Sequence, residues 1–92
     1  MKTIELLVLP VSSGSYQLKL PIAAKLLSCK RIDNNFFLSF ISRPNSLMEF
    51  RNFKVVTDNE VINDKQELRY ICSDINKPPT QSYYLFEIID HE

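Results

Sequence analysis

Side chains capable of catalysis are few and widely separated in this chain of 92 residues. The only histidine, His91, stands second from the end of the sequence, where chains commonly fray. Ser-His-Asp and Cys-His centres need a histidine held firmly beside the nucleophile, so we expect neither here. The nearest pair of carboxylates, Asp58 and Glu60, is assigned to a solvated loop. The sequence therefore predicts a protein that is not an enzyme.

The cysteines and the single glycine argue against two common kinds of ligand site. Cys29 and Cys72 lie far apart, and neither has a histidine or another cysteine nearby. Zinc sites, in contrast, gather such ligands at short spacings. Glycine-rich loops that hold phosphate need several glycines, and Gly14 is the only one in the chain. We therefore predict no metal site and no cofactor.

Cations and tyrosines could form a binding surface instead. Arginine presents a planar fork of donors that suits phosphate or carboxylate, and tyrosine stacks on a base or packs against a partner. The candidate ligand-binding residues are Arg51, Lys54, Arg69, Tyr83 and Tyr84. Each has a structural alternative. A strand arginine commonly pairs with a carboxylate such as Glu49 or Glu67, and a tyrosine commonly completes a core.

Alternating apolar residues predict the elements that carry these side chains. We expect strands at residues 2–10, 16–20, 26–32, 36–41, 48–56, 67–73 and 83–89. Seven short strands separated by turn residues predict a mainly β fold, either a small antiparallel β-sandwich or a part-open barrel. At most one short helical turn is expected, at Pro21–Lys25. Residues 1–92 are predicted to form one β domain with a charged tail, residues 90–92.

Turn residues predict how the strands pair. The turn at Gly14 favours a hairpin between the first two strands, and Asp33–Asn35 favours a tight hairpin between the third and fourth. The fourth and fifth strands are expected to be antiparallel neighbours near the middle of a sheet. The last strand, apolar on both faces, is expected in the middle of a sheet or at an interface.

Two further expectations concern irregular segments. The apolar phase of the fifth strand changes between Phe50 and Phe53, which predicts a β-bulge near Arg51 or Asn52. The polar stretch that follows this strand is expected to be a packed loop anchored by Val61 and Ile62.

Charge balance limits the classes of partner. Eleven lysines and arginines match eleven aspartates and glutamates, so the chain has no broad positive field for DNA or RNA. Near-zero net charge also lowers the electrostatic cost of self-association, so we expect a homo-oligomer. Its subunit interface is expected to use Tyr83, Tyr84 and Phe86.

Apolar runs are far shorter than the roughly 18 residues that cross a membrane. No secretory signal pattern stands at the beginning of the sequence. We therefore expect a cytoplasmic protein without membrane contact. In that compartment Cys29 and Cys72 are expected to be reduced thiols in the core.

Several short motifs resemble a family of small phage and prophage proteins that share a domain of unknown function. They are Leu20–Ser28, Glu49–Phe53, Leu68–Ile71 and Leu85–Glu87. Where that family tends to carry Gly-Thr-Gly-His, this chain has Val56–Asn59. The resemblance implies a phage accessory protein with a compact β fold, acting in the cytoplasm of the host cell.

Small phage proteins without catalytic residues often inhibit a bacterial defence by stoichiometric binding. The first functional hypothesis is therefore an inhibitor that is a sponge for a nucleotide signal or masks a host defence protein. The alternative is a structural or assembly module of a phage particle or complex.

Overall fold

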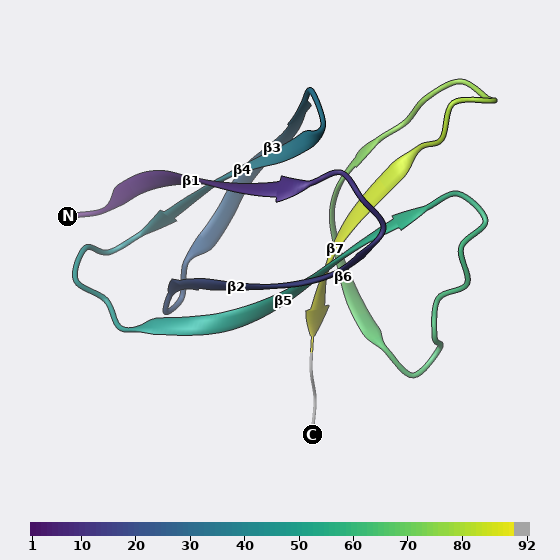
Figure 1. The fold of residues 1–92 in the computed structure, drawn as a ribbon. Coiled ribbons are helices and arrows are strands. Elements are labelled where there is room, and N and C mark those ends of the chain that lie inside the picture. Colours follow the sequence, from purple (N-terminus) through teal and green to yellow (C-terminus); the bar gives the residue numbers. More distant parts are fainter. Residues whose placement is uncertain (90–92) are drawn as a thin grey trace.

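The protein is an open sandwich of two antiparallel β-sheets, shown as a ribbon in Figure 1. The computed structural model describes residues 1–89, so the predicted charged tail and His91 lie outside the described part. The strands are β1 (Thr3–Pro10), β2 (Gly14–Pro21), β3 (Lys25–Ile32), β4 (Asn35–Ser42), β5 (Met48–Thr57), β6 (Glu67–Asp74) and β7 (Tyr83–Ile89). One sheet has the order β1-β4-β3 and the other β2-β5-β7-β6. The predicted mainly β class is confirmed.

The core lies between the two sheets. Strand β4 shows most clearly how alternating residues form this core. Its Phe36, Leu38 and Phe40 are buried, while the residues between them are less buried. Successive side chains of a strand point to opposite faces, so these three share the inner face. The facing sheet contributes Leu20, Phe53, Val55 and Leu85. Burial of each large apolar side chain contributes about 1.5–3 kcal/mol.

Strand pairing differs from the prediction in two places. Strand β1 pairs with β4 and β2 pairs with β5, so the predicted hairpin between the first two strands is wrong. Strands β4 and β5 also lie in different sheets, so they are not neighbours. Short turns after β1 and β4 carry the chain across the sandwich instead of back along the same sheet. Apolar alternation identifies a strand without showing which sheet it joins.

Two other pairing predictions are confirmed. Strands β3 and β4 form a tight hairpin with Ile32 opposite Asn35, and Asp33 in the turn takes a positive φ of 55°. Strand β7 lies between β5 and β6, as expected for a strand that is apolar on both faces. The short segment after Pro21 is a turn, closed by the Ala24 N–H donating to the Pro21 carbonyl at 3.1 Å.

The β-bulge predicted near Arg51 or Asn52 is wrong. Strand β5 pairs with β2 without a register shift from Met48 to Val55. The apolar phase changes because Phe50 lies on the outer face and is 62% exposed, while Arg51 takes the inward position. The bulges lie instead in β3, between Leu26 and Ser28, and in β6, between Tyr70 and Cys72.

The loop between β5 and β6 is not packed as predicted. Val61 is 90% exposed and Ile62 is 37% exposed, so neither anchors the loop in the core. Polar contacts hold it instead: the Glu60 carboxylate accepts hydrogen bonds from the Ser13 hydroxyl at 2.6 Å and from the Thr57 N–H at 3.2 Å. These bonds lower the pKa of Glu60, because they favour its charged form.

A disulfide joins the two sheets, which corrects the prediction of reduced thiols. Cys29 of β3 and Cys72 of β6 are bonded, with their Cα atoms 6.1 Å apart. An ion pair lies on the same two strands, with 2.6 Å between Arg31 Nη1 and Asp74 Oδ2. The sequence did not show this bond, because the two cysteines come together only when edge strands of different sheets meet.

Reduction of this disulfide is expected to lower the free energy of unfolding by about 2–4 kcal/mol, because the unfolded chain gains entropy when the loop between the cysteines is released. Urea unfolding with and without a reductant measures the difference. The double variant Cys29→Ala/Cys72→Ala is the control and should not respond to the reductant. Equal midpoints for the unmodified protein in both conditions would contradict the assignment.

Candidate functional site

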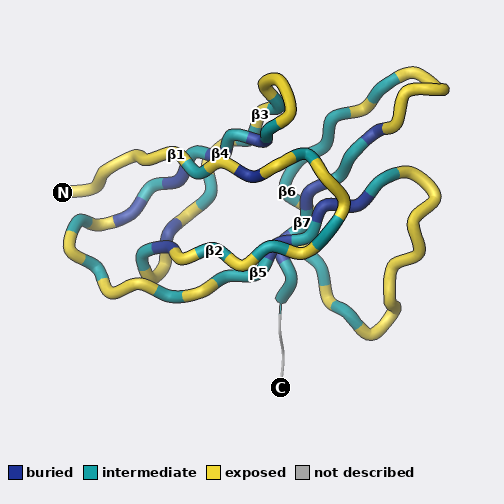
Figure 2. Tube along the Cα trace, in the orientation of Figure 1, coloured by how far each residue is buried: buried dark blue, intermediate teal, exposed yellow. Residues whose placement is uncertain are grey.

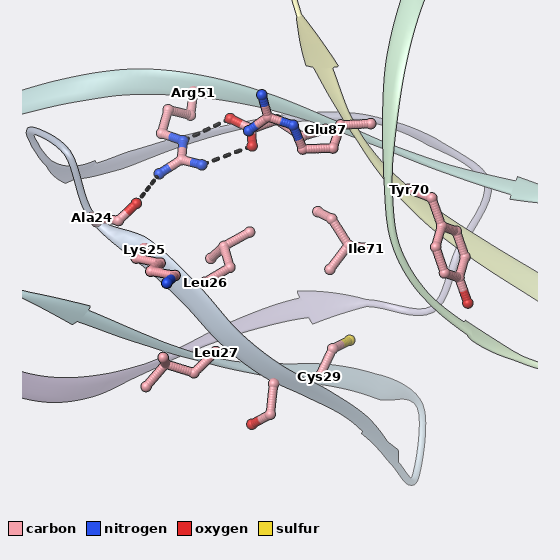
Figure 3. A pocket seen from close by; sticks show the side chains of 11 residues that line it. Ala24, Lys25, Leu26, Leu27, Cys29, Arg51, Tyr70, Ile71 and Glu87 are labelled. Carbon is pink, nitrogen blue, oxygen red and sulfur yellow. Dashed lines mark hydrogen bonds and ion pairs between the residues drawn. The ribbon is translucent and has the colours of Figure 1, made fainter.

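A pocket of about 390 Å³ opens between β3 and β6, the edge strands at one side of the sandwich. Its apolar wall includes Leu26, Leu27 and Ile71. Figure 3 shows Arg51 and Glu87 at one end of the pocket and Cys29 at the other. Both bulges lie along it, since Leu27 and Ile71 are the residues at which the two registers shift. Bulges bend a strand and redirect its side chains, which explains why the pocket lies at this level of the sandwich.

An ion pair forms the polar end of the pocket. Arg51 Nε donates to Glu87 Oε2 at 2.6 Å, and Nη2 donates to Oε1 at 2.7 Å. The third donor, Nη1, bonds the Ala24 carbonyl at 2.7 Å, immediately before β3. Only 14% of the Arg51 side chain and 7% of the Glu87 side chain are exposed. The bond with Glu87 raises the pKa of Arg51 and outweighs the opposing effect of burial, so the arginine stays charged.

Arg51 retains hydrogen-bonding capacity beyond these contacts. Its guanidinium has five N–H groups, and three of them bond residues within the described part of the chain. The other two are available to water or to a ligand in the pocket.

Arg69 of β6 is a second arginine in the same pocket. It lies opposite Glu87 in the pairing of β6 with β7 and is exposed. Within residues 1–89 it makes no hydrogen bond or ion pair, whereas both oxygens of Glu87 accept from Arg51. With Lys25, the pocket lining has three cations and one anion, in a chain whose net charge is zero. The pocket is therefore locally positive.

Three of the predicted binding residues lie elsewhere. Lys54 donates to the Gln66 side chain at 3.2 Å, outside the pocket. The Tyr83 ring packs near Arg31, 5.6 Å from its guanidinium carbon to the ring centre. The Tyr84 hydroxyl donates to Asp58 at 3.1 Å, which raises the pKa of Tyr84. Of the five candidates, the structure brings only Arg51 and Arg69 together, and their role in binding stays a prediction.

Sequence reasoning missed Glu87, although a signal for it was present. Glu87 is the only charged residue within β7, whose other members are aromatic or aliphatic. A charge on the inner face of a central strand needs a partner, because an unpaired buried charge is costly. That argument would have selected Glu87 as the partner of Arg51, in place of Glu49 or Glu67.

The other acidic residues considered for chemistry have structural contacts. Asp58 accepts from the Ser82 N–H at 2.9 Å as well as from Tyr84. Across residues 1–89, no three histidine, cysteine, aspartate or glutamate side chains gather in a group that could hold a metal ion. The described part of the chain also holds no helix of the length and apolarity that a bilayer crossing requires.

Comparison with family models, curated proteins and solved structures finds no match to this chain.

Glu87→Gln is expected to lower the free energy of unfolding by about 3–5 kcal/mol, because it leaves the largely buried charge of Arg51 without its counter-ion. Chemical denaturation measures this loss. The control is Asp74→Asn in the more exposed Arg31–Asp74 pair, whose side chains are 28% and 26% exposed. That change should cost at most about 1 kcal/mol. Equal losses in the two variants would contradict a structural role for the Arg51–Glu87 pair.

Proposed function

We propose that the protein is a non-enzymatic binding protein whose pocket takes a small anionic ligand of the nucleotide type. The observation that carries the proposal is that Arg69, which makes no hydrogen bond or ion pair within residues 1–89, lines the same pocket as Arg51, which has N–H groups to spare. Arginine forks form strong, charge-assisted hydrogen bonds with phosphate oxygens. The pocket volume of about 390 Å³ falls within the usual range for small-molecule sites.

In the proposed complex, the charged residues of the lining would contact the phosphate and the apolar residues would contact the base. Phosphate oxygens would bridge Arg69 and the two spare N–H groups of Arg51, while Lys25 adds positive charge at the rim. The flat base would lie against Leu26, Leu27 and Ile71. Glu87 does not repel the ligand strongly, because both its oxygens are engaged by Arg51. The ligand is held and released unchanged.

The family resemblance extends this proposal to a biological role. A phage accessory protein that binds a nucleotide tightly would act as a sponge, lowering the concentration of a signal that a bacterial defence uses. Masking of a defence protein is the other form of the same inhibitory role. Such a protein works in the host cytoplasm.

An assembly module of a phage particle is the second candidate, and one observation favours it. Strand β1 presents Ile4, Leu6 and Val8 to solvent, 65%, 66% and 50% exposed. Apolar side chains in a row on an exposed strand are typical of a surface that meets another protein. An assembly module should form an open, concentration-dependent series of assemblies in light scattering, whereas a closed small oligomer favours the inhibitor.

The nucleotide proposal predicts a thermal shift with at least one member of a panel of cyclic and ADP-ribose-type nucleotides. A ligand at 100 times its Kd should add about 2.7 kcal/mol of stability. Arg69→Gln should weaken binding about tenfold or more, since a hydrogen bond to a charged group contributes about 1.5–3 kcal/mol. Lys77→Gln, an exposed cation outside the pocket, is the matched control and should bind like the unmodified protein.

Two outcomes would overturn the nucleotide proposal. One is the absence of a shift with every nucleotide of the panel. The other is an equal loss of binding in the Arg69 and Lys77 variants, which would indicate general charge attraction instead of a built site.

A further inference from the structure

Strand β1 has a free edge unlike the three other sheet edges. Figure 2 shows long exposed stretches along this strand. Strands β3 and β6 each contain a bulge and are joined to each other by the disulfide. Strand β2 carries Gln17 and Lys19 along its length and ends at Pro21. Bulges, lysines and prolines are the devices that keep sheet edges from pairing with other chains. Strand β1 has no bulge and no lysine, its proline stands at its last position, and its one charged residue is Glu5.

The pairing of β1 with β4 shows which backbone groups point to the free edge. The Val11 N–H donates to the Asn34 carbonyl at 2.9 Å, which continues the β1–β4 register by one position. Because hydrogen-bonded pairs alternate along an antiparallel ladder, the odd-numbered residues of β1 bond to β4. The N–H and C=O groups of Ile4, Leu6 and Val8 therefore face away from β4. Pro10 has the same phase, so its missing N–H costs the sheet no hydrogen bond.

The same three residues carry the exposed apolar side chains of β1. The contrast with β2 is direct. The Ile22 N–H donates to the Leu47 carbonyl at 2.7 Å, so the edge-facing residues of β2 are the odd-numbered ones. Those residues are Ser15, Gln17, Lys19 and Pro21. One edge therefore combines free backbone donors and acceptors with apolar side chains, and the other combines them with polar side chains.

We propose that two copies of this chain join edge to edge through β1, as antiparallel strands related by a two-fold axis at Leu6. Leu6 of one copy then lies opposite Leu6 of the other, and Ile4 lies opposite Val8. All three positions have backbone groups facing the edge, so the ladder gains about six hydrogen bonds. The two three-stranded sheets become one continuous sheet of six strands.

Self-complementarity identifies a second copy as the occupant. Residues directly opposite each other share a face, so only registers that pair even with even positions keep the apolar side chains together. Centring the axis on Glu5 would put two glutamates opposite each other, which is unfavourable. Centring it on Leu7 would leave Ile4 opposite Pro10. The axis at Leu6 places Glu5 opposite Leu7 and pairs Ile4 with Val8 twice.

The position of this edge keeps the dimer independent of the proposed ligand site. In the order β1-β4-β3, the pocket lies at the β3 edge and the proposed interface at the β1 edge. Both pockets of the dimer therefore stay open. A single strand pair is smaller than a standard interface of about 800 Å² per partner, so the dimer should dissociate on dilution. Symmetric pairing uses up both free β1 edges, so the assembly closes at two copies.

Sedimentation equilibrium tests the proposal on the full chain. The mass should rise with concentration from 10.7 kDa to twice that value and no further. Leu6→Pro removes an edge-facing N–H without breaking a bond to β4, and it should leave a folded monomer. Gln17→Pro makes the matching change on β2 and should leave the dimer intact. Leu6→Lys, which places two like charges opposite each other, replaces Leu6→Pro if that variant does not fold.

Cysteine cross-linking tests the register. In the proposed dimer the Cα atoms at position 6 of the two copies lie about 5.5 Å apart, within reach of a disulfide, so Leu6→Cys should form a covalent dimer on mild oxidation. The atoms at position 4 lie about 13 Å apart along the strands, so Ile4→Cys should not.

Three results would overturn the inference. They are a monomer at every concentration, growth beyond two copies, and equal cross-linking at positions 4 and 6. Loss of nucleotide binding alone would leave the dimer standing, so the two proposals fail separately.

Discussion

One arginine bonds both sheets at the polar end of the pocket. Arg51 on β5 bonds Glu87 on β7 within its own sheet and the Ala24 carbonyl at the start of the other sheet's β3. A buried ion pair is tolerated only when its remaining polar atoms are also satisfied. Within residues 1–89, every buried side-chain nitrogen and oxygen has a hydrogen-bond partner. The chain therefore places a charged pair beside its apolar core without leaving an unpaired group.

The edge strands at the two sides of the sandwich differ in regularity and in the side chains they expose. At one side, two bulged strands meet, and a disulfide and an ion pair hold them together. The bulges lie along a pocket whose lining has three cations and one anion, in a chain whose net charge is zero. At the other side, β1 keeps a regular edge with apolar side chains. The proposed anion site thus lies at one side and the proposed dimer edge at the other.

Local patterns in the sequence were sufficient for the strands and insufficient for their arrangement. Alternation of apolar residues located all seven strands, and Asp33 in its turn located the β3–β4 hairpin. The assignment of strands to sheets failed because a short turn serves equally well to pair two strands or to cross the sandwich. The change of apolar phase at Arg51 predicts a bulge, whereas the structure fills the inward position with a charged side chain whose partner is Glu87. The Cys29–Cys72 bond and the pocket depend on contacts between sheets, which no local pattern contains.

Binding of an anion between Arg51 and Arg69 can be followed through the arginine Nε–H resonances. During a nucleotide titration followed by ¹⁵N NMR, the Arg69 signal should move most and the Arg51 signal should move less, because Arg51 Nε is already bonded to Glu87. Arg31, which is paired with Asp74 outside the pocket lining, should stay in place. Movement of the Arg31 signal without the Arg69 signal, or no movement of either pocket arginine with a nucleotide that binds, would contradict anion binding between Arg51 and Arg69.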